Sequence, residues 1–417
     1  MQPVFTNDAI VLGLLMGVLA LVFYTASSAR SGWKKFYTYV PPLLLCYFLP
    51  ALLYWPLGLI SGEVSELYTV ASRYFLPASL ILFCLSIDLK AVLNLGPKAL
   101  IMFLTGTLGI VLGGPIALLV VLYLMPGVIP VTPDELWRGL STIAGSWIGG
   151  GANQTAMKEI FEVADNLFGT MIIVDVVVAN IWMGFLLYGA NISNRLDQRL
   201  KADNSAIETL KNKVEAFSER VRRIPTTTDA FLLMGVAFGG VALSHIGADV
   251  VTPWMSRHAE TLNNLGLNSL TSSFFWLVVF ATTLGFAASF TKLRALEGVG
   301  ASRWGSVFIY FLVTTIGMKM NLGEVFNNLG LFAIGIVWML VHVSLLLLVA
   351  RLIRAPFFFV AVGSQANVGG AASAPIVASA FSPALAPVGV LLAVLGYAVG
   401  TYGALICAFL MQSVAGG

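Results

Sequence analysis

The sequence predicts an all-α polytopic membrane protein, and three observations carry this prediction. Of its 417 residues, 58% are hydrophobic and only 10% are charged, whereas about a quarter of the residues of a soluble domain are charged. Long apolar runs recur along the whole chain, each close to the roughly 20 residues that span a bilayer as a helix. The runs are continuous rather than alternating, which excludes a transmembrane β-barrel.

Twelve apolar segments follow one another along the chain. One hydrophilic stretch, 191–228, divides them six and six. We therefore predict a first repeat over 1–190, a cytoplasmic linker over 191–228 and a second repeat over 229–417. The segments are 9–26, 39–60, 71–87, 98–124, 136–160, 167–190, 229–249, 272–290, 304–318, 328–350, 355–381 and 386–412.

Two pairs of similar stretches support an internal repeat. "NLGPKAL" (94–100) is similar to "NLGLFAI" (328–334), and each opens the fourth segment of its half. "GSWIGGGANQTA" (145–156) is similar to "GSQANVGGAASA" (363–374), and each lies inside the fifth segment. Few residues are identical within each pair, but the paired stretches occupy corresponding positions in the two halves.

The basic residues predict the topology, because lysine and arginine concentrate in cytoplasmic loops. "ARSGWKK" (29–35) is then cytoplasmic and "SGEVSE" (61–66) external. The linker 191–228 carries eight basic residues, so it should also be cytoplasmic. This is possible only if the fifth segment returns to the side from which it entered. The eleventh segment must return likewise.

If the fifth and eleventh segments do not cross, the chain has about ten transmembrane helices plus two re-entrant or broken helices. Each half then has five crossings, an odd number, so the two repeats have inverted topology. A discontinuous helix that crosses completely is the alternative to each re-entrant hairpin, and it places the same residues at the same depth.

The interrupted segments are the predicted substrate site. Non-helical backbone at membrane depth occurs only where protein or a water-filled cavity covers it, and glycines supply the turn. Uncharged polar side chains beside the turns suit Na⁺ and hydrogen-bonding solutes, although they could instead only cap the helix ends. The predicted substrate-binding residues are Gly150, Gly151, Asn153, Gln154 and Thr155 in the first tip, and Ser364, Gln365, Asn367, Gly369 and Gly370 in the second.

Asp175 is the strongest single candidate for ion coupling. It lies about eight residues into its segment, within "MIIVDVVVANIWM" (171–183), and an ionisable group at that depth indicates function. It could bind Na⁺ or carry a proton; the alternative is a hydrogen-bonded packing residue. Asn153, Asn367 and Asn180 are the further ion-coupling candidates, although Asn180 lies about 140° around the helix from Asp175.

Other residues point away from an enzyme. No phosphate-binding loop or metal-ligand spacing is present, and no positioned base is evident for Ser146 or Ser364. His342, in the middle of a segment, could relay protons but is better explained as a packed core residue. We expect no cofactor apart from a Na⁺ held by Asp175, and no nucleic-acid partner.

The linker contains "IETLKNKVEAFSERV" (207–221), whose apolar residues follow steps of three and four. This indicates either a two-heptad coiled-coil seam or an amphipathic helix that lies against the membrane or the protein.

Three stretches resemble a known family. "GSWIGGGANQTAM" (145–157), "VDVVVANIWM" (174–183) and "ANVGGAASAPIVASAF" (366–381) are similar to hallmark stretches of the YjcL-like bacterial membrane proteins. That family is grouped with sodium symporters for bile acid, glutamate and citrate, and with cation/proton antiporters.

The resemblance implies two inverted repeats, a core domain that holds the interrupted segments, and a scaffold domain that often forms a homodimer. It also implies Na⁺ or H⁺ coupling. The paired acids of many antiporters are absent, and so is the arginine that some carboxylate symporters place in the second hairpin, which argues against a dicarboxylate substrate.

These observations together predict a cation-coupled symporter of a small organic solute in a bacterial inner membrane. It would work by alternating access of the elevator type. A cation/proton antiporter is the first alternative, and a non-transporting membrane sensor or intramembrane enzyme is the second.

Overall fold

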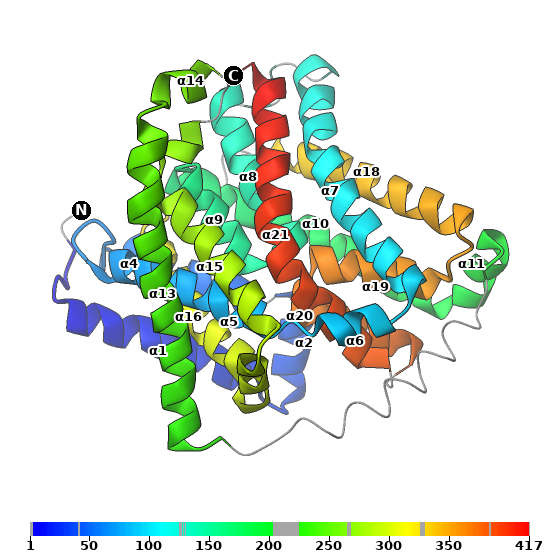
Figure 1. Cartoon of the computed structure of the whole chain (residues 1–417), viewed down its shortest axis with the longest axis horizontal. Coiled ribbons are helices and arrows are strands. Elements are labelled where there is room, and N and C mark those ends of the chain that lie inside the picture. The colour runs from blue at the N-terminus through cyan, green and yellow to red at the C-terminus, as the bar shows by residue number, and fades with distance from the viewer. Residues whose placement is uncertain are drawn as a thin grey trace.

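The computed structural model describes residues 3–40, 42–124, 127, 129, 131–202, 225–264, 268–325, 330–382 and 385–416. Within these ranges all regular secondary structure is helical (Figure 1). The seam expected over 207–221 lies outside the described residues.

Seven helical stretches in the described part are long and apolar enough to cross a membrane, and an eighth is a bent pair. The pair is α15 (Ser273–Ser289) with η3 (Lys292–Val299), bent by 96°. The seven stretches are α1 (Asp8–Ala26), α4-η1-α5 (Leu67–Leu85), α7 (Pro97–Leu124), α10 (Asp165–Asn191), α13 (Thr227–Ser256), α18 (Leu331–Leu352) and most of α21 (Ala386–Ala415).

The all-helical, multi-spanning prediction is confirmed at this level, while the count of about ten crossings stays a prediction. Two expected crossings are short helices. α3 (Pro42–Tyr54) has 13 residues and α16 (Ala301–Gly317) has 17, which at 1.5 Å per residue reach about 20 and 26 Å. Both lengths are below the roughly 30 Å of a hydrocarbon core.

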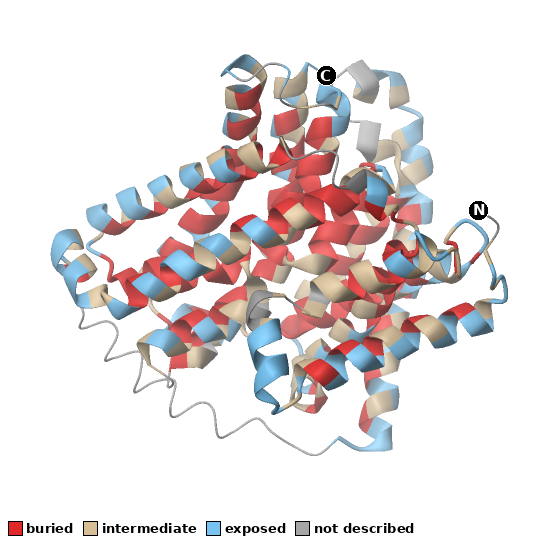
Figure 2. Cartoon of the chain, turned by 180° about the vertical axis from the view of Figure 1, so that it is seen from behind, coloured by how far each residue is buried: buried red, intermediate tan, exposed pale blue. Residues whose placement is uncertain are grey.

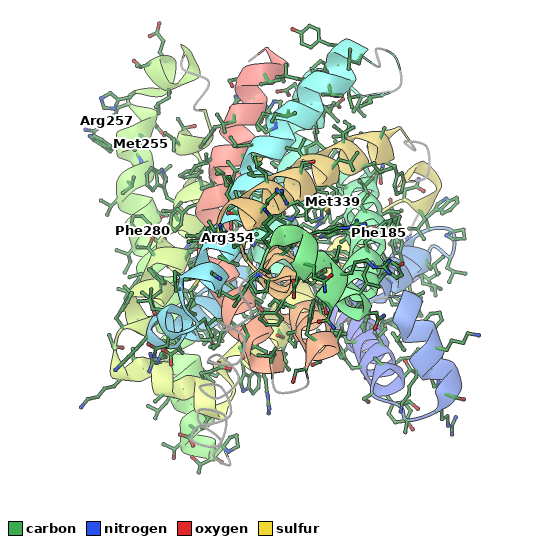
Figure 3. All side chains as sticks on the ribbon, turned by 90° about the vertical axis from the view of Figure 1, so that its right-hand side faces the viewer. Phe185, Met255, Arg257, Phe280, Met339 and Arg354 are labelled. Carbon is green, nitrogen blue, oxygen red and sulfur yellow. The ribbon has the colours of Figure 1, made fainter. Side chains whose placement is uncertain are left out.

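The long helices form two packed groups. The scaffold group, defined as α1, α3, α4-η1-α5, α13, α15 and α16, packs mainly on itself. The hairpin group comprises α7, α10, α18 and α21 with four shorter helices: α8 (Pro133–Gly149), α9 (Gly151–Ile160), α19 (Phe357–Val368) and α20 (Gly370–Phe381). In Figure 3, Met255 and Phe280 of the scaffold group lie on the side opposite Phe185 and Met339 of the hairpin group.

The packing neighbours correspond between the two halves of the chain. α5 (Leu76–Leu85) packs on α15 as α16 packs on α3, and α13 packs on α15 as α1 packs on α3. α7 and α18, the fourth segments of the two halves, pack on each other. This correspondence agrees with an internal repeat, which itself stays a prediction.

Glycines let α7 and α18 approach closely. A Cβ at Gly113 would meet the Trp338 ring at 2.6 Å, and one at Gly109 would meet the His342 Cα at 3.1 Å. Small residues of this kind allow close helix packing in a membrane. The Trp338 indole N–H donates to the Ile110 carbonyl of α7 over 2.8 Å, so the contact also satisfies a buried polar group.

Short helices connect the longer ones. They are α2 (Ser31–Tyr39), α6 (Leu89–Asn94), α11 (Ser193–Leu200), α14 (Ala259–Asn264), η2 (Asn268–Thr271) and α17 (Leu322–Val325). Buried residues concentrate in the middle of the molecule, while the outward faces of the long helices are exposed (Figure 2). Those exposed faces are apolar along α1, α7, α13 and α18, as a lipid-facing surface requires.

Candidate functional site

The first interrupted segment is a helical hairpin. α8 begins at a capping box between Thr132 and Glu135 and ends at Gly150, whose φ of +76° favours glycine. α9 then runs back along it: the Arg138 guanidinium donates to the Phe161 carbonyl over 3.1 Å, and the rings of Trp137 and Phe161 lie 5.2 Å apart. The two arms of this segment therefore run antiparallel, as in a helical hairpin, while its path relative to the membrane stays a prediction.

The second interrupted segment has the same form. α19 and α20 meet at Gly369 and Gly370, and Gly370 has a φ of +60°. At the open end, the rings of Phe358 and Phe381 lie 5.3 Å apart. The two arms therefore run antiparallel.

The two hairpins open at opposite ends of α10. At its start, Lys158 of the first hairpin pairs with Asp165 over 2.9 Å. Beyond its end, the backbone N–H of Phe357, at the start of the second hairpin, donates to Asp197 of α11 over 2.7 Å. The 27 residues of α10 extend about 40 Å at 1.5 Å per residue, so the openings are far apart.

The two tips meet on α21. A Cβ at Gly396 would lie 2.8 Å from the carbonyl oxygen of Ile148 and 3.6 Å from that of Ala366. These carbonyls belong to the last turns of α8 and α19. A Cβ at Gly400 would lie 2.8 Å from the backbone nitrogen of Gly149. The two glycines of α21 thus hold the ends of both hairpins within contact.

Asn153 joins the first tip to α21. Its amide N–H group donates to the Tyr397 carbonyl over 3.0 Å and to the Gly149 carbonyl over 3.1 Å. Its carbonyl accepts from the Thr401 hydroxyl over 2.5 Å. Asn153 is fully buried, so it fixes the hairpin against the long helix.

Asn367 makes the equivalent set of bonds to α7. It donates to the Phe103 carbonyl over 3.0 Å and to the Gly363 carbonyl over 2.8 Å, and it accepts from the Thr107 hydroxyl over 2.8 Å. Each asparagine therefore binds a carbonyl and a hydroxyl four residues apart on one helix.

Replacing Asn367 by alanine is expected to lower the free energy of unfolding by about 1–3 kcal/mol, because buried partners lose their hydrogen bonds. Asn180→Ala is the matched control, since the Asn180 amide donates within its own helix, to the Val176 carbonyl over 2.7 Å, and to no other described residue. Thermal unfolding in detergent measures both. Equal losses in the two variants would show that the bonds to α7 contribute nothing specific.

Asp175 binds the first hairpin through its carboxylate. The Trp147 indole N–H donates to Oδ1 over 2.7 Å and the Gln154 amide donates to Oδ2 over 3.0 Å. Asp175 is 6% exposed, and no ion pair to it occurs among the described residues. Asn180 does not join this cluster.

Ser364, in the second hairpin, has a neighbouring base that the sequence did not reveal. His342 Nε2 lies 2.8 Å from the Ser364 hydroxyl, and His342 Nδ1 lies 3.0 Å from the Gly106 carbonyl. Because that carbonyl only accepts, Nδ1 carries the proton and Nε2 accepts from serine. The Trp182 indole N–H donates to the same hydroxyl over 2.8 Å. Ser364 and His342 are fully buried, which agrees with His342 as a packed core residue.

The remaining tip side chains are buried, while the tip glycines are partly accessible. Thr155 donates to the Gly151 carbonyl over 2.8 Å, and the Gln365 amide donates to the Ser373 hydroxyl over 2.7 Å. The four glycines Gly150, Gly151, Gly369 and Gly370 are half-buried. A Cβ at Gly370 would meet nothing within 4 Å. The backbone of the tip glycines is therefore more accessible than the predicted side chains.

Comparison with known proteins places the chain in a family. A family model described as "Protein of unknown function (DUF819)" matches residues 13–414. The chain belongs to the DUF819 family. It is also 24% identical over 371 residues to the "Uncharacterized membrane protein YjcL" of Bacillus subtilis (strain 168), covering 84% of this chain and 85% of that protein. The predicted resemblance to YjcL is thereby confirmed as a distant homology, and the chain is a multi-pass membrane protein.

In this DUF819 protein, sequence reasoning missed the helices that receive the hairpins. Gly396 and Gly400 form a small-residue pair four apart, "GYAVG" (396–400), and this spacing is a packing signal in membrane helices. It could have indicated α21 as the helix on which the tips meet. Trp147 and Trp182 carry no comparable signal. No group of three or more His, Cys, Asp or Glu side chains that could hold a metal ion occurs in the part that the structure describes.

Proposed function

We propose that this DUF819 protein is a secondary active transporter that couples the symport of a small organic solute to Na⁺ or H⁺. The observation that carries the proposal is the pair of glycine-tipped hairpins that open at opposite ends of α10 and meet on α21. Broken or hairpin helices that meet at mid-membrane are where transporters bind substrate and coupling ions.

The charges at the two ends of the molecule support opposite entry of the hairpins. At the end where the second hairpin opens, the Lys98 ammonium donates to the Arg354 carbonyl and the Arg351 guanidinium donates to the Arg199 carbonyl. This end is basic, and basic loops face the cytoplasm. The opposite end contains Asp165, which pairs with both Lys158 and Lys319. The first hairpin would then enter from outside.

The cation would bind at Asp175. A carboxylate costs a few kcal/mol in the middle of a membrane unless it is compensated, and its hydrogen bonds supply part of this compensation. Backbone carbonyls in the last turn of α8, where a helix leaves some carbonyls without an intrahelical partner, would complete an oxygen shell for Na⁺. A proton on Asp175 is the other form of compensation, and it would couple transport to H⁺.

The two helix groups suggest how the protein moves. We propose that the hairpin group moves against the scaffold group in an elevator-type cycle, and that the scaffold group forms a homodimer in a bacterial inner membrane. Asp175 is the one acidic residue deep within a predicted segment, whereas many antiporters pair two acids there, and this favours symport over a cation/proton antiporter.

Solute-dependent currents in proteoliposomes test this proposal. Purified protein would be adsorbed on a solid-supported membrane and exposed to a panel of amino acids, short peptides and organic acids, with and without Na⁺ and at two pH values. A current that needs both a solute and one cation supports symport. A current that needs only Na⁺ and a pH gradient indicates an antiporter, and no current with any pairing contradicts transport.

A further inference from the structure

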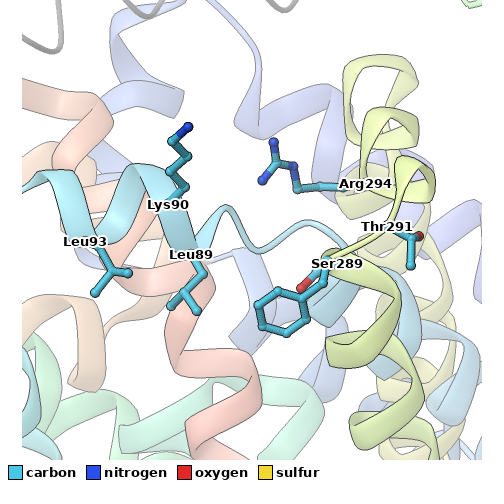
Figure 4. Close-up of a pocket in the computed structure, with 7 residues that line it drawn as sticks. Leu89, Lys90, Leu93, Ser289, Thr291 and Arg294 are labelled. Atoms are coloured by element: carbon cyan, nitrogen blue, oxygen red, sulfur yellow. The ribbon is translucent and has the colours of Figure 1, made fainter.

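A pocket outside the hairpin site lies between α6 and the bend from α15 to η3 (Figure 4). Its volume is about 350 Å³, and Lys90 and Arg294 line it from opposite sides. Ser289 and Thr291, at the bend from α15 to η3, also line the pocket. The pocket belongs to neither hairpin and takes no part in the proposed transport site.

The lining is positively charged. It includes two cations and no acidic side chain. Arg294 pairs with Asp88 over 2.9 Å, but the same Asp88 oxygen also caps α6 by accepting from the Ala91 N–H over 3.0 Å. No ion pair to Lys90 occurs among the described residues. The pocket therefore retains a net charge that an anion would neutralise.

Exposed apolar side chains stand beside the cations. Leu93 is 58% exposed and Phe290 is 62% exposed, and both line the pocket. α15 is apolar over its length and ends where the chain bends by 96°, so the pocket lies at the level where a membrane helix leaves the hydrocarbon. Two cations with an apolar rim at this level match a ligand that is anionic at one end and apolar at the other.

We propose that this pocket binds the phosphate of an anionic phospholipid headgroup, with Lys90 and Arg294 on the phosphate and the acyl chains along Leu93 and Phe290. Free inorganic phosphate shares the anionic chemistry but not the apolar part. Each lysine or arginine near an anionic membrane surface strengthens lipid binding. Removing one lysine should therefore weaken the affinity about fivefold.

Native mass spectrometry of delipidated full-length protein tests this assignment. Phosphatidylglycerol is titrated in a neutral detergent, with phosphatidylcholine and inorganic phosphate as separate arms. We expect retained phosphatidylglycerol, little phosphatidylcholine, and about fivefold weaker phosphatidylglycerol binding in Lys90→Gln. Lys90 is exposed, so this variant should fold.

Lys35→Gln is the matched control, because it removes the same charge from another exposed position, on α2. Equal weakening in both variants would show general attraction to basic surface and overturn the proposal. Displacement of phosphatidylglycerol by millimolar inorganic phosphate would assign the site to a free phosphate instead. Equal retention of phosphatidylcholine would show that the charge of the headgroup does not determine binding, which contradicts the proposal.

Discussion

Asp175→Asn is expected to reduce cation-driven accumulation to the level of protein-free liposomes while the protein stays folded and inserted. The substitution preserves the size of the side chain and removes its charge. The Gln154 amide, which now donates to Asp175 over 3.0 Å, can turn so that its oxygen accepts from the new amide. The hairpin therefore keeps its partner, but the group that would bind Na⁺ or a proton is lost.

Asp229→Asn is the matched control for this variant. Asp229 is also a buried carboxylate, but it belongs to the capping box of α13 in the scaffold group, where it accepts from the Thr226 backbone N–H over 3.0 Å, and the side-chain oxygen of asparagine can accept the same bond. Its accumulation rate should stay near that of the native protein. Native accumulation in Asp175→Asn, measured under the same imposed gradient, would show that Asp175 only packs.

Gly400→Ala is expected to lower the free energy of unfolding by about 1–3 kcal/mol or more, as overpacking of a close contact does. The new methyl group would lie 2.8 Å from the backbone nitrogen of Gly149, and backbone cannot move aside as a flexible side chain can. The first hairpin would separate from α21, which also strains the bond from Thr401 to Asn153. Transport should fall with stability.

Gly239→Ala gives the opposite expectation for the same chemical change. Gly239 lies in α13, and a Cβ there would meet nothing within 4 Å. Alanine is favoured over glycine inside a helix by about 0.5–1 kcal/mol, so this variant should be slightly more stable than the native protein. Thermal unfolding measures whether each variant is less or more stable than the native protein. An unchanged midpoint in Gly400→Ala would contradict the close contact of the tip with α21.

The sequence predicted the hairpins because their signals are local. Glycines beside polar residues within an apolar run identify an interruption, and Gly150 and Gly370 do adopt positive φ there. The charge of the linker predicts that the fifth segment returns to the side from which it entered, and this orientation stays a prediction. Asp175 was likewise visible, since a carboxylate amid valines has no local explanation.

The partners of these residues could not be predicted, because they are distant in sequence. Thr401 lies 248 positions from Asn153 and yet binds its amide group. The base beside Ser364 was missed because His342 belongs to another helix. The shortness of α3 was also hidden, since the apolar segment 39–60 continues beyond both ends of this helix.

The sides from which the two hairpins enter the membrane can be measured directly by cysteine labelling. Single cysteines would replace Ala164 at the opening of the first hairpin, Ser382 at the opening of the second and Ser205 in the linker. The buried native residues Cys46, Cys84 and Cys407 would be replaced by alanine. Our account predicts that an impermeant maleimide labels position 164 in intact cells, and positions 205 and 382 only after permeabilisation. Labelling of 164 and 382 from the same side would contradict hairpins that enter from opposite faces.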